Sequence, residues 1–152
     1  MQTVLTQEVQ DIMNKRFGKD SLFALATAKN NVPFVRAVNA YYENGCFYII
    51  THALSNKIQQ MKENSICSLC GDWFTAQGVG ENMGHILAEG NGEIASKLRS
   101  AFSEWYDNGH SDENGPNTVI LRVRLTRGVL FSHGTRYDID FTKTENVSRK
   151  NQ

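Results

Sequence analysis

One stretch of the sequence, from Pro33 to Asn64, restricts the fold of this chain more than any other. Its first part alternates as a β-strand does, with Phe34, Arg36, Val38, Ala40 and Tyr42 on one face and Val35, Ala37, Asn39 and Tyr41 on the other. Residues 43–45, Glu-Asn-Gly, then favour a hairpin turn, because Asn and Gly tolerate positive φ. The apolar run at 46–51 is short and rich in aromatic and β-branched residues, so it predicts a second strand.

A helix is predicted directly after this second strand. Ser55 is a good N-cap residue, and the sequence from Lys57 onward is typical of a helix. If the hairpin pairs in this way, Arg36 and Thr51 approach the same point as Ser55 and Lys57. A guanidinium, an ammonium, two hydroxyls and a helix N-terminus together are typical of a phosphate-binding site.

A simpler interpretation of the two cations stays open. Arg36 and Lys57 could pair with surface carboxylates such as Glu43 or Glu63, in which case they would bind no ligand. His52, beside the same loop, is interpreted as an ordinary loop residue or as an acid–base group that works near neutral pH.

The composition of the chain predicts one soluble domain. Its 152 residues and 17.1 kDa are enough for a single core, and 40% hydrophobic and 21% charged residues are ordinary globular usage. Sixteen basic residues offset sixteen acidic ones, so no overall field favours nucleic acid or an anionic membrane. No apolar run approaches the roughly 20 residues that span a bilayer, and the first residues are too polar for a signal peptide. With three cysteines as well, we expect a reducing, cytoplasmic location.

The remaining sequence predicts further strands and two more helices. The predicted helices are 6–17, with Thr6 as cap, and 91–106, and the predicted strands are 22–28, 66–71, 73–79, 119–125, 129–132 and 136–141, with a turn at 126–128. Successive hairpins that lead into a crossover helix favour an antiparallel sheet closed into a barrel. We expect residues 1–141 to form one domain and 142–152 to be a polar tail.

The order of an Arg in a strand, a hairpin, a strand that ends in Thr and an S-x-K helix start resembles the pyridoxamine 5′-phosphate oxidase-like family. The resemblance is strongest over residues 21–70. It implies a mainly β fold with flanking helices (α+β), a split β-barrel of the FMN-binding type. It also implies FMN contacts from Arg36, Ala37, Val38, Ile50, Thr51, Ser55, Lys57 and Gln77.

The same resemblance implies an FMN-dependent oxidoreductase of unidentified small-molecule substrate. No Arg-x-His segment for a pyridoxal phosphate substrate is found near the C-terminus, so FMN binding is better supported than vitamin B6 oxidation. The alternatives are a non-catalytic flavin-binding or sensing module and a deazaflavin-using reductase. The family fold implies a homodimer with flavin at its interface, and we expect Phe74 and Val79 to belong to the apolar patch that the second subunit covers.

One cysteine motif and one glycine motif have both a functional and a structural interpretation. Cys67 and Cys70 form a CxxC, but on a strand these positions face opposite sides, so two buried structural cysteines are favoured over a metal or redox site. Gly78 and Gly80 lack the third glycine and the βαβ context of a dinucleotide site. They are expected to allow a close approach of backbone or of a flavin ring.

Several polar and aromatic residues have weaker functional interpretations. In the loop 107–117, His110 with nearby carboxylates could bind a metal, but a solvated loop is favoured and we predict no metal site. Arg122 and Arg124 share one strand face, which favours a solvated outer surface over a nucleic-acid site. Three further aromatic residues are candidates for ring stacking, with a core role favoured for each: Trp73, Trp105 and Tyr137.

Overall fold

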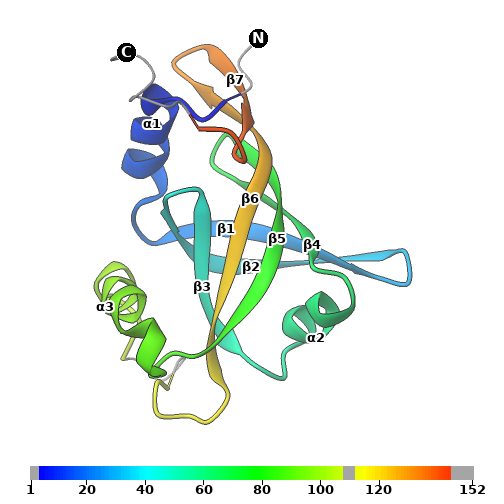
Figure 1. Cartoon of the computed structure of the whole chain (residues 1–152), viewed down its shortest axis with the longest axis vertical. Coiled ribbons are helices and arrows are strands. Elements are labelled where there is room, and N and C mark those ends of the chain that lie inside the picture. The colour runs from blue at the N-terminus through cyan, green and yellow to red at the C-terminus, as the bar shows by residue number, and fades with distance from the viewer. Residues whose placement is uncertain (1–3, 108–111, 145–152) are drawn as a thin grey trace.

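The computed structural model of the chain describes residues 4–107 and 112–144. Within these ranges it is mainly β, with three α-helices and one short 3₁₀ turn (Figure 1). The helices are α1 (Gln7–Phe17), α2 (Asn56–Glu63) and α3 (Gly92–Ala101), and the 3₁₀ turn is Glu89–Asn91. The strands are β1 (Ser21–Lys29), β2 (Val32–Glu43), β3 (Cys46–His52), β4 (Ile66–Gly71), β5 (Phe74–His85), β6 (Thr118–Ser132) and β7 (Thr135–Asp140).

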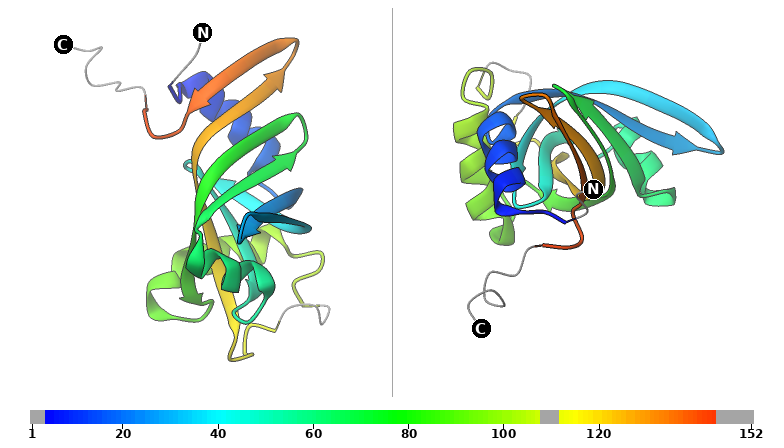
Figure 2. Two further views of the ribbon diagram at one scale, coloured as in Figure 1. Left: turned by 90° about the vertical axis from the view of Figure 1, so that its right-hand side faces the viewer. Right: turned by 90° about the horizontal axis from the view of Figure 1, so that it is seen from above.

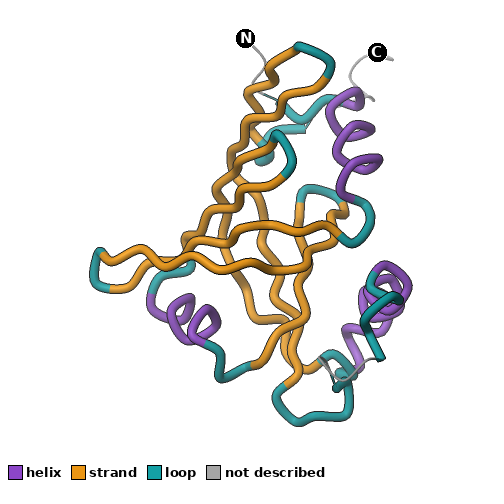
Figure 3. Tube along the Cα trace, turned by 180° about the vertical axis from the view of Figure 1, so that it is seen from behind, coloured by secondary structure: helices purple, strands orange, loops and turns teal. Residues whose placement is uncertain are grey.

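Six of the described strands close into an antiparallel barrel. Their order is β3-β2-β1-β4-β5-β6, and β3 pairs with β6 to complete the ring, from Cys46 opposite Arg124 to His52 opposite Thr118. β7 pairs with the far half of β6, where the β6–β7 hairpin rises beyond the barrel (Figure 3). The mainly β architecture with flanking helices and the closure of the sheet into a barrel, both expected from the sequence, are confirmed.

The three helices cover two sides of the barrel. α1 and α3 lie on one side and α2 lies on the other, as both the front view and the view from above show (Figures 1 and 2). α1 begins where the sequence predicts, because the Thr6 hydroxyl accepts a hydrogen bond from the Val9 N–H at 3.3 Å. Val9, Met13 and Phe17, spaced four residues apart, form its buried face.

The barrel interior is filled by aromatic rings. Phe23 and Phe47, from β1 and β3, have ring centroids 4.6 Å apart, and Phe17 of α1 lies 5.1 Å from Phe23. Tilted and edge-on contacts of this kind are favourable for aromatic pairs. A second, smaller cluster lies under α3 on the outside of the barrel and consists of Ile86, Ala95, Leu98, Phe102, Tyr106 and Ile120.

The turn predicted at residues 126–128 is wrong, because β6 runs through it as one strand. The register skips Thr126 there, since Gln77 faces Arg127 while the next residue of β5, Gly78, faces Leu125. Thr126 is therefore a β-bulge, and its hydroxyl donates to the Gln77 carbonyl at 3.1 Å. Gly128, which suggested a turn, instead allows close packing, because a Cβ there would lie 2.9 Å from the Phe141 ring.

The predicted helix over residues 91–106 is too long at both ends. Asn91 lies in the 3₁₀ turn, and its side-chain amide donates to the carbonyls of Met83 at 3.1 Å and His85 at 2.8 Å rather than capping α3. At the other end, residues 102–107 form turns rather than a continued helix. Hydrogen bonding to the end of β5 therefore sets where α3 begins.

The expected exposed patch around Phe74 and Val79 is also wrong. Phe74 is buried in the aromatic core, and Val79 is partly buried. β5 begins at Phe74 rather than at Trp73, because Trp73 occupies the β4–β5 turn with φ of +51°. Phe74 therefore faces inward as the first residue of β5, and Trp73 is exposed in the turn.

The cysteine and glycine motifs both have structural roles. Cys67 is buried, which raises the pKa of its thiol to about 11, while Cys70 is exposed on the opposite face, so the expectation that both are buried is wrong for Cys70. At Gly78 an added Cβ would lie 2.8 Å from the backbone oxygen of Arg124, and at Gly80 it would lie 2.4 Å from the Met61 sulfur. These glycines allow β6 and α2 to approach β5.

No helix in residues 4–107 or 112–144 is long and apolar enough to span a bilayer. The cytoplasmic location stays a prediction, as does the boundary between a domain ending at 141 and a tail. Thr144 forms a β-bridge with Leu5, and the rest of the expected tail, from 145 to 152, lies outside the described residues.

Candidate functional site

The barrel is split between β2 and β3. Within the described chain these strands share only the pairs from Tyr41–Tyr48 to Glu43–Cys46, after which they diverge. β2 continues along β1, and β3 continues along β6, so each has one edge that no strand pairs on this side. Backbone N–H and C=O groups on such edges can hydrogen-bond a ligand.

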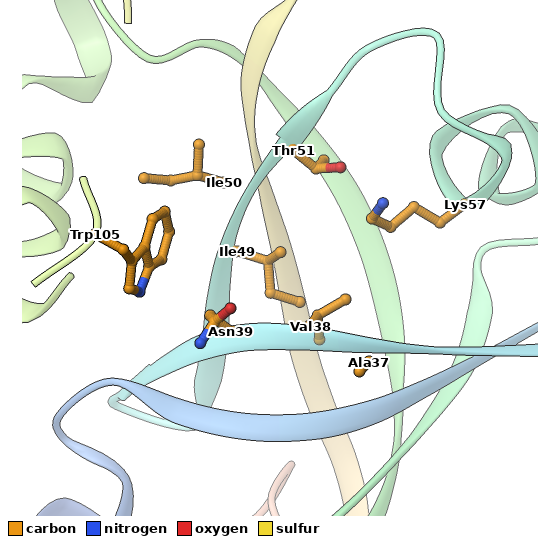
Figure 4. A pocket seen from close by; sticks show the side chains of 8 residues that line it. All are labelled: Ala37, Val38, Asn39, Ile49, Ile50, Thr51, Lys57 and Trp105. Atoms are coloured by element: carbon orange, nitrogen blue, oxygen red, sulfur yellow. The ribbon is translucent and has the colours of Figure 1, made fainter. Parts of the chain in front are cut away.

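A cavity of about 270 Å³ lies in this split (Figure 4). Lys57 from the first turn of α2 lies on one side of it, and Trp105 from the turns after α3 lies on the other. The lining residues are Ala37, Val38, Asn39, Ile49, Ile50, Thr51, Lys57 and Trp105.

Arg36 is fixed beside the Lys57 end of the cavity by hydrogen bonds to its guanidinium. Its Nη1 donates to the Leu25 carbonyl at 3.2 Å and to the Thr27 hydroxyl at 2.8 Å, and its Nη2 donates to Gln60 Oε1 at 3.2 Å. Thr27 and Gln60 are buried and hydrogen-bond each other, so β1 and α2 together hold the Arg36 side chain. A guanidinium has five N–H donors, and these contacts leave others for a ligand.

The two cations of this end have no carboxylate partner in the described ranges. Glu43, the partner that a surface interpretation suggests, accepts from Lys97 Nζ at 2.7 Å instead. Neither Arg36 nor Lys57 lies within ion-pair distance of any described acidic group. Burial lowers the pKa of both, and the positive charge of Arg36 lowers the pKa of Lys57 further. Two neighbouring cations in this state favour an anionic ligand.

Ser55 has the backbone of an N-cap residue but does not form the capping bond. Its φ of −65° and ψ of 154° fit the expected position before α2, yet its side chain makes no cap hydrogen bond. Its Oγ is buried and has no hydrogen-bond partner among the described groups. A buried hydroxyl left in this way costs about 1–3 kcal/mol, so its position beside Lys57 suits a hydrogen bond to a ligand phosphate.

The opposite end of the cavity is aromatic. Trp105 stacks on Phe102 with centroids 4.7 Å apart and an interplanar angle of 25°. Ile50 of β3 and Asn39 of β2 are the lining residues on the Trp105 side of the cavity (Figure 4). The cavity therefore has cations at one end and a planar apolar surface at the other.

The structure brings most of the predicted cofactor residues together. Ala37, Val38, Ile50, Thr51 and Lys57 line the cavity. Arg36 precedes Ala37 on β2 and bonds Gln60 of α2, and Ser55 is the N-cap residue of α2, two positions before Lys57. Gln77 does not line it. It lies on β5, three strand spacings or roughly 14 Å from β2, and borders a separate groove with Thr75 and Arg127. Its assignment as a cofactor contact stays a prediction.

The sequence alone did not assign Asn39 or Ile49 to the site, and it gave Trp105 as a stacking candidate with a core role favoured. Asn39 had one available signal, because it shares a strand face with Ala37. Of the stacking candidates, Trp105 lines the cavity. Trp73 does not line it: its side chain is 72% exposed and contacts the ring of Phe131.

The other functional candidates have local partners. The third stacking candidate, Tyr137, donates to Glu8 at 3.0 Å. Arg122 and Arg124 both pair with Glu81, at 3.0 and 3.3 Å, so both arginines have a local carboxylate partner. His52 Nδ1 accepts a hydrogen bond from the Leu54 N–H at 3.1 Å, which is an ordinary loop contact.

His110, the candidate metal ligand, lies at 108–111, outside the described residues, so the prediction of no metal site there stays a prediction. Glu113 of the same loop accepts hydrogen bonds from Arg99 at 2.8 Å and Tyr106 at 2.7 Å. Among the described residues no group of three or more His, Cys, Asp or Glu side chains is placed to hold a metal ion.

The six strands form an antiparallel ring, and β2 and β3 separate along part of their length to leave a cavity. This architecture is that of the split β-barrel proteins. Residues 5–130 match the family model described as pyridoxamine 5′-phosphate oxidase, and this covers well over half of the chain. The chain belongs to that family. No curated protein sequence matches the chain significantly.

Solved structures share this fold at low sequence identity. An FAD-binding protein from Mesorhizobium loti is 18% identical with a TM-score of 0.62, covering 77% of this chain and 89% of that protein. A Clostridium acetobutylicum protein of the pyridoxinephosphate oxidase family, related to general stress protein 26, is 14% identical with a TM-score of 0.59, covering 88% and 92%. A heme binding protein from Mycobacterium smegmatis is 11% identical with a TM-score of 0.62, covering 86% and 59%. At these identities the likeness shows the fold.

Proposed function

We propose that this protein binds FMN in the split between β2 and β3. The phosphate would contact Lys57, Arg36 and the Ser55 hydroxyl, and the isoalloxazine ring would extend between the strand edges toward Trp105. The observation that carries this proposal is the polarity of the cavity. At one end lie two desolvated cations with no carboxylate partner in the described part of the chain, and at the other lies an aromatic wall. FMN has a dianionic end and a planar end in the same arrangement.

The unpaired strand edges support the ring position. Ala37 and Val38 on β2, and Ile50 on β3, border the cavity where their strands have diverged. Their backbone groups can donate to and accept from the pyrimidine edge of a flavin whatever their side chains are. Family membership and the FAD-binding structural relative support a flavin in this site.

The cavity suits a flavin better than a haem. Haem iron in proteins takes axial ligands such as His, Cys, Met or Tyr. The eight residues that line the cavity include none of these types. The heme binding relative therefore supports a shared fold without supporting the same ligand here.

We propose that the bound FMN makes the protein an oxidoreductase for a small molecule. A flavin would supply the hydride or electron transfer. The residues of this chain bind the phosphate, orient the ring through backbone groups and place Trp105 against its apolar end. A flavin-binding or sensing module without turnover, and a deazaflavin-using reductase, are the alternatives that the experiment below separates.

We propose that the functional unit is a homodimer formed through the outer face of β2, β1, β4 and β5. The cross-strand registers place uncharged side chains in two rows over these strands. One row is Val35, Ala26, Ser68 and Gln77, and the other is Ala37, Ala24, Cys70 and Thr75. Val35 is 70% exposed and Leu22, on the same face, is 68% exposed, which is unfavourable in water unless a partner covers them.

This arrangement would give Gln77 a role. The face begins at Ala37, a cavity residue, and ends at Gln77, so a two-fold contact would bring Gln77 of one protomer toward the cavity of its partner. The predicted cofactor contact of Gln77 would then be made across the interface.

Titration of the purified, flavin-free protein with FMN, riboflavin and haem tests the assignment. We expect tight FMN binding, weaker riboflavin binding and no specific haem absorption band. Addition of NADH or NADPH to the FMN complex should bleach the visible absorption band of the oxidised flavin if the protein is an oxidoreductase. Flavin that binds tightly and stays oxidised with each donor would favour the sensing module, and weak FMN affinity with tight deazaflavin binding would favour the reductase.

A further inference from the structure

The end of the cavity away from Lys57 is held together by one carboxylate that does not line it. We propose that Asp20 is a positioning residue, which fixes Trp105 as the wall against which the planar ring of a bound ligand packs. This inference rests on the proposed flavin site for the identity of the ring. It assigns the recognition of the ring to the Asp20–Trp105 pair, separate from the recognition of phosphate by Lys57 and Arg36.

Asp20 accepts one hydrogen bond on each of its oxygens. Oδ2 accepts from Trp105 Nε1 at 2.8 Å, and Oδ1 accepts from Asn39 Nδ2 at 2.9 Å. Both donors belong to cavity-lining residues. Asp20 precedes β1, whereas Asn39 lies on β2 and Trp105 follows α3, so one side chain joins three separate segments. Hydrogen bonds to an ionised carboxylate are stronger than those between neutral groups.

A stacking contact on one ring face also holds the Trp105 indole in place. One face stacks on Phe102, which is fully buried in the cluster under α3. Its N–H is held by Asp20, so the plane of the indole is set by two independent contacts. The rest of the ring borders the cavity beside Ile50 (Figure 4). A preorganised aromatic surface binds a planar group with little loss of side-chain freedom.

Loss of Asp20 should therefore weaken the contacts of the protein with the ligand ring and leave its contacts with the phosphate unchanged. Without the carboxylate, Trp105 can turn about its side-chain bonds, and Asn39 loses the contact that directs its amide. A ligand that has the ring alone should lose as much affinity as one that has ring and phosphate. Loss of Lys57 should instead weaken the phosphate-bearing ligand selectively.

The experiment uses the full-length protein with Trp73→Phe, which leaves Trp105 as its single tryptophan. Acrylamide quenching of Trp105 fluorescence, measured without ligand, reports whether Asp20 holds the indole. Binding of lumiflavin, which lacks the ribityl phosphate, and of FMN reports the role in ring recognition. Asp20→Ala and Trp105→Leu are compared with Lys57→Ala, and Asp11→Ala, on the exposed face of α1, is the matched carboxylate control.

For Asp20→Ala we expect more efficient acrylamide quenching and an affinity loss of about tenfold for both lumiflavin and FMN, within the range that stacking on one aromatic side chain provides. Asp20→Asn, which keeps one acceptor oxygen, should give a smaller loss. Trp105→Leu should reproduce the ligand pattern of Asp20→Ala, and Asp11→Ala should change neither readout.

Two results would overturn the inference separately from the flavin assignment. Unchanged quenching in Asp20→Ala would show that Asp20 does not hold Trp105, and increased quenching with unchanged lumiflavin affinity would show that Trp105 has no role in ring binding. If the unmutated protein binds neither FMN nor lumiflavin, the proposed function fails and the ring-recognition role fails with it. The quenching result still decides whether Asp20 positions the indole.

Discussion

Replacing Lys57 with Ala should separate the phosphate contact of FMN from every other contact that the flavin makes. The Lys57 amine is partly buried at the start of α2 and has no carboxylate partner among the described residues. Burial and the positive charge of Arg36 both act against its protonated form. Its removal therefore breaks no ion pair and relieves a repulsion, so the free protein should unfold at the same temperature or a higher one.

The magnitude follows from the kind of contact that is lost. A hydrogen bond to a charged group is worth about 1.5–3 kcal/mol, so the FMN dissociation constant should rise roughly tenfold to a hundredfold. Riboflavin has the same ring and ribityl chain without the phosphate, so its affinity should change less than twofold, about 0.4 kcal/mol. Arg36→Ala should show the same selectivity, with an added loss of stability because Thr27 and Gln60 lose a partner.

The assay is titration of flavin-free protein, followed by the quenching of flavin fluorescence and by calorimetry. Lys62→Ala is the matched control, because Lys62 is an exposed lysine in the last turn of the same helix. Equal losses of FMN and riboflavin affinity in Lys57→Ala would refute the phosphate assignment. A Lys62 variant that behaves like the Lys57 variant would show that the effect is one of net charge.

Three further predictions concern pH, assembly and packing. Because the pKa of Lys57 is lowered in the folded protein, the unfolded chain binds this proton more tightly, so the stability of the free protein should rise with pH between the lowered pKa and the ordinary value of roughly 10.4. FMN affinity should fall over the same range, since a neutral amine no longer attracts phosphate, and Lys57→Ala should flatten both curves in calorimetric titrations and thermal melts. Light scattering should give twice the chain mass, with FMN stabilising the dimer, and a monomer that still binds FMN tightly would contradict the proposed interface. Gly78→Ala should cost about 1–3 kcal/mol in denaturant unfolding because its Cβ would meet the Arg124 backbone, whereas Gly90→Ala, with open space around it, should cost far less, and equal costs would argue against the close strand approach.

The sequence by itself predicted that the two cations of the proposed phosphate site belong to one strand–turn–strand–helix unit. Arg36 and Lys57 lie within one strand–turn–strand–helix unit, and the alternation of β2, the Asn-Gly turn and the Ser55 cap position are local signals. Because β2 pairs with the next strand, β3, and α2 follows β3 directly, the residue pattern was enough to predict that these side chains lie close together. The local pattern did not reveal that Thr27 and Gln60 hold Arg36, since those residues meet only after β1 and α2 have packed.

Only the tertiary structure decided the aromatic end of the site and the irregular parts of the sheet. Trp105 and Asp20 are 85 residues apart, so no local periodicity could connect them, and the favoured interpretation of Trp105 was a core role. The segment around the Thr126 bulge had the composition of a turn, because a glycine such as Gly128 suits both a turn and a close approach between packed elements. Pairing to β5 and packing against Phe141 kept this segment in a strand, because a long strand there satisfies backbone hydrogen bonds that a turn would leave exposed.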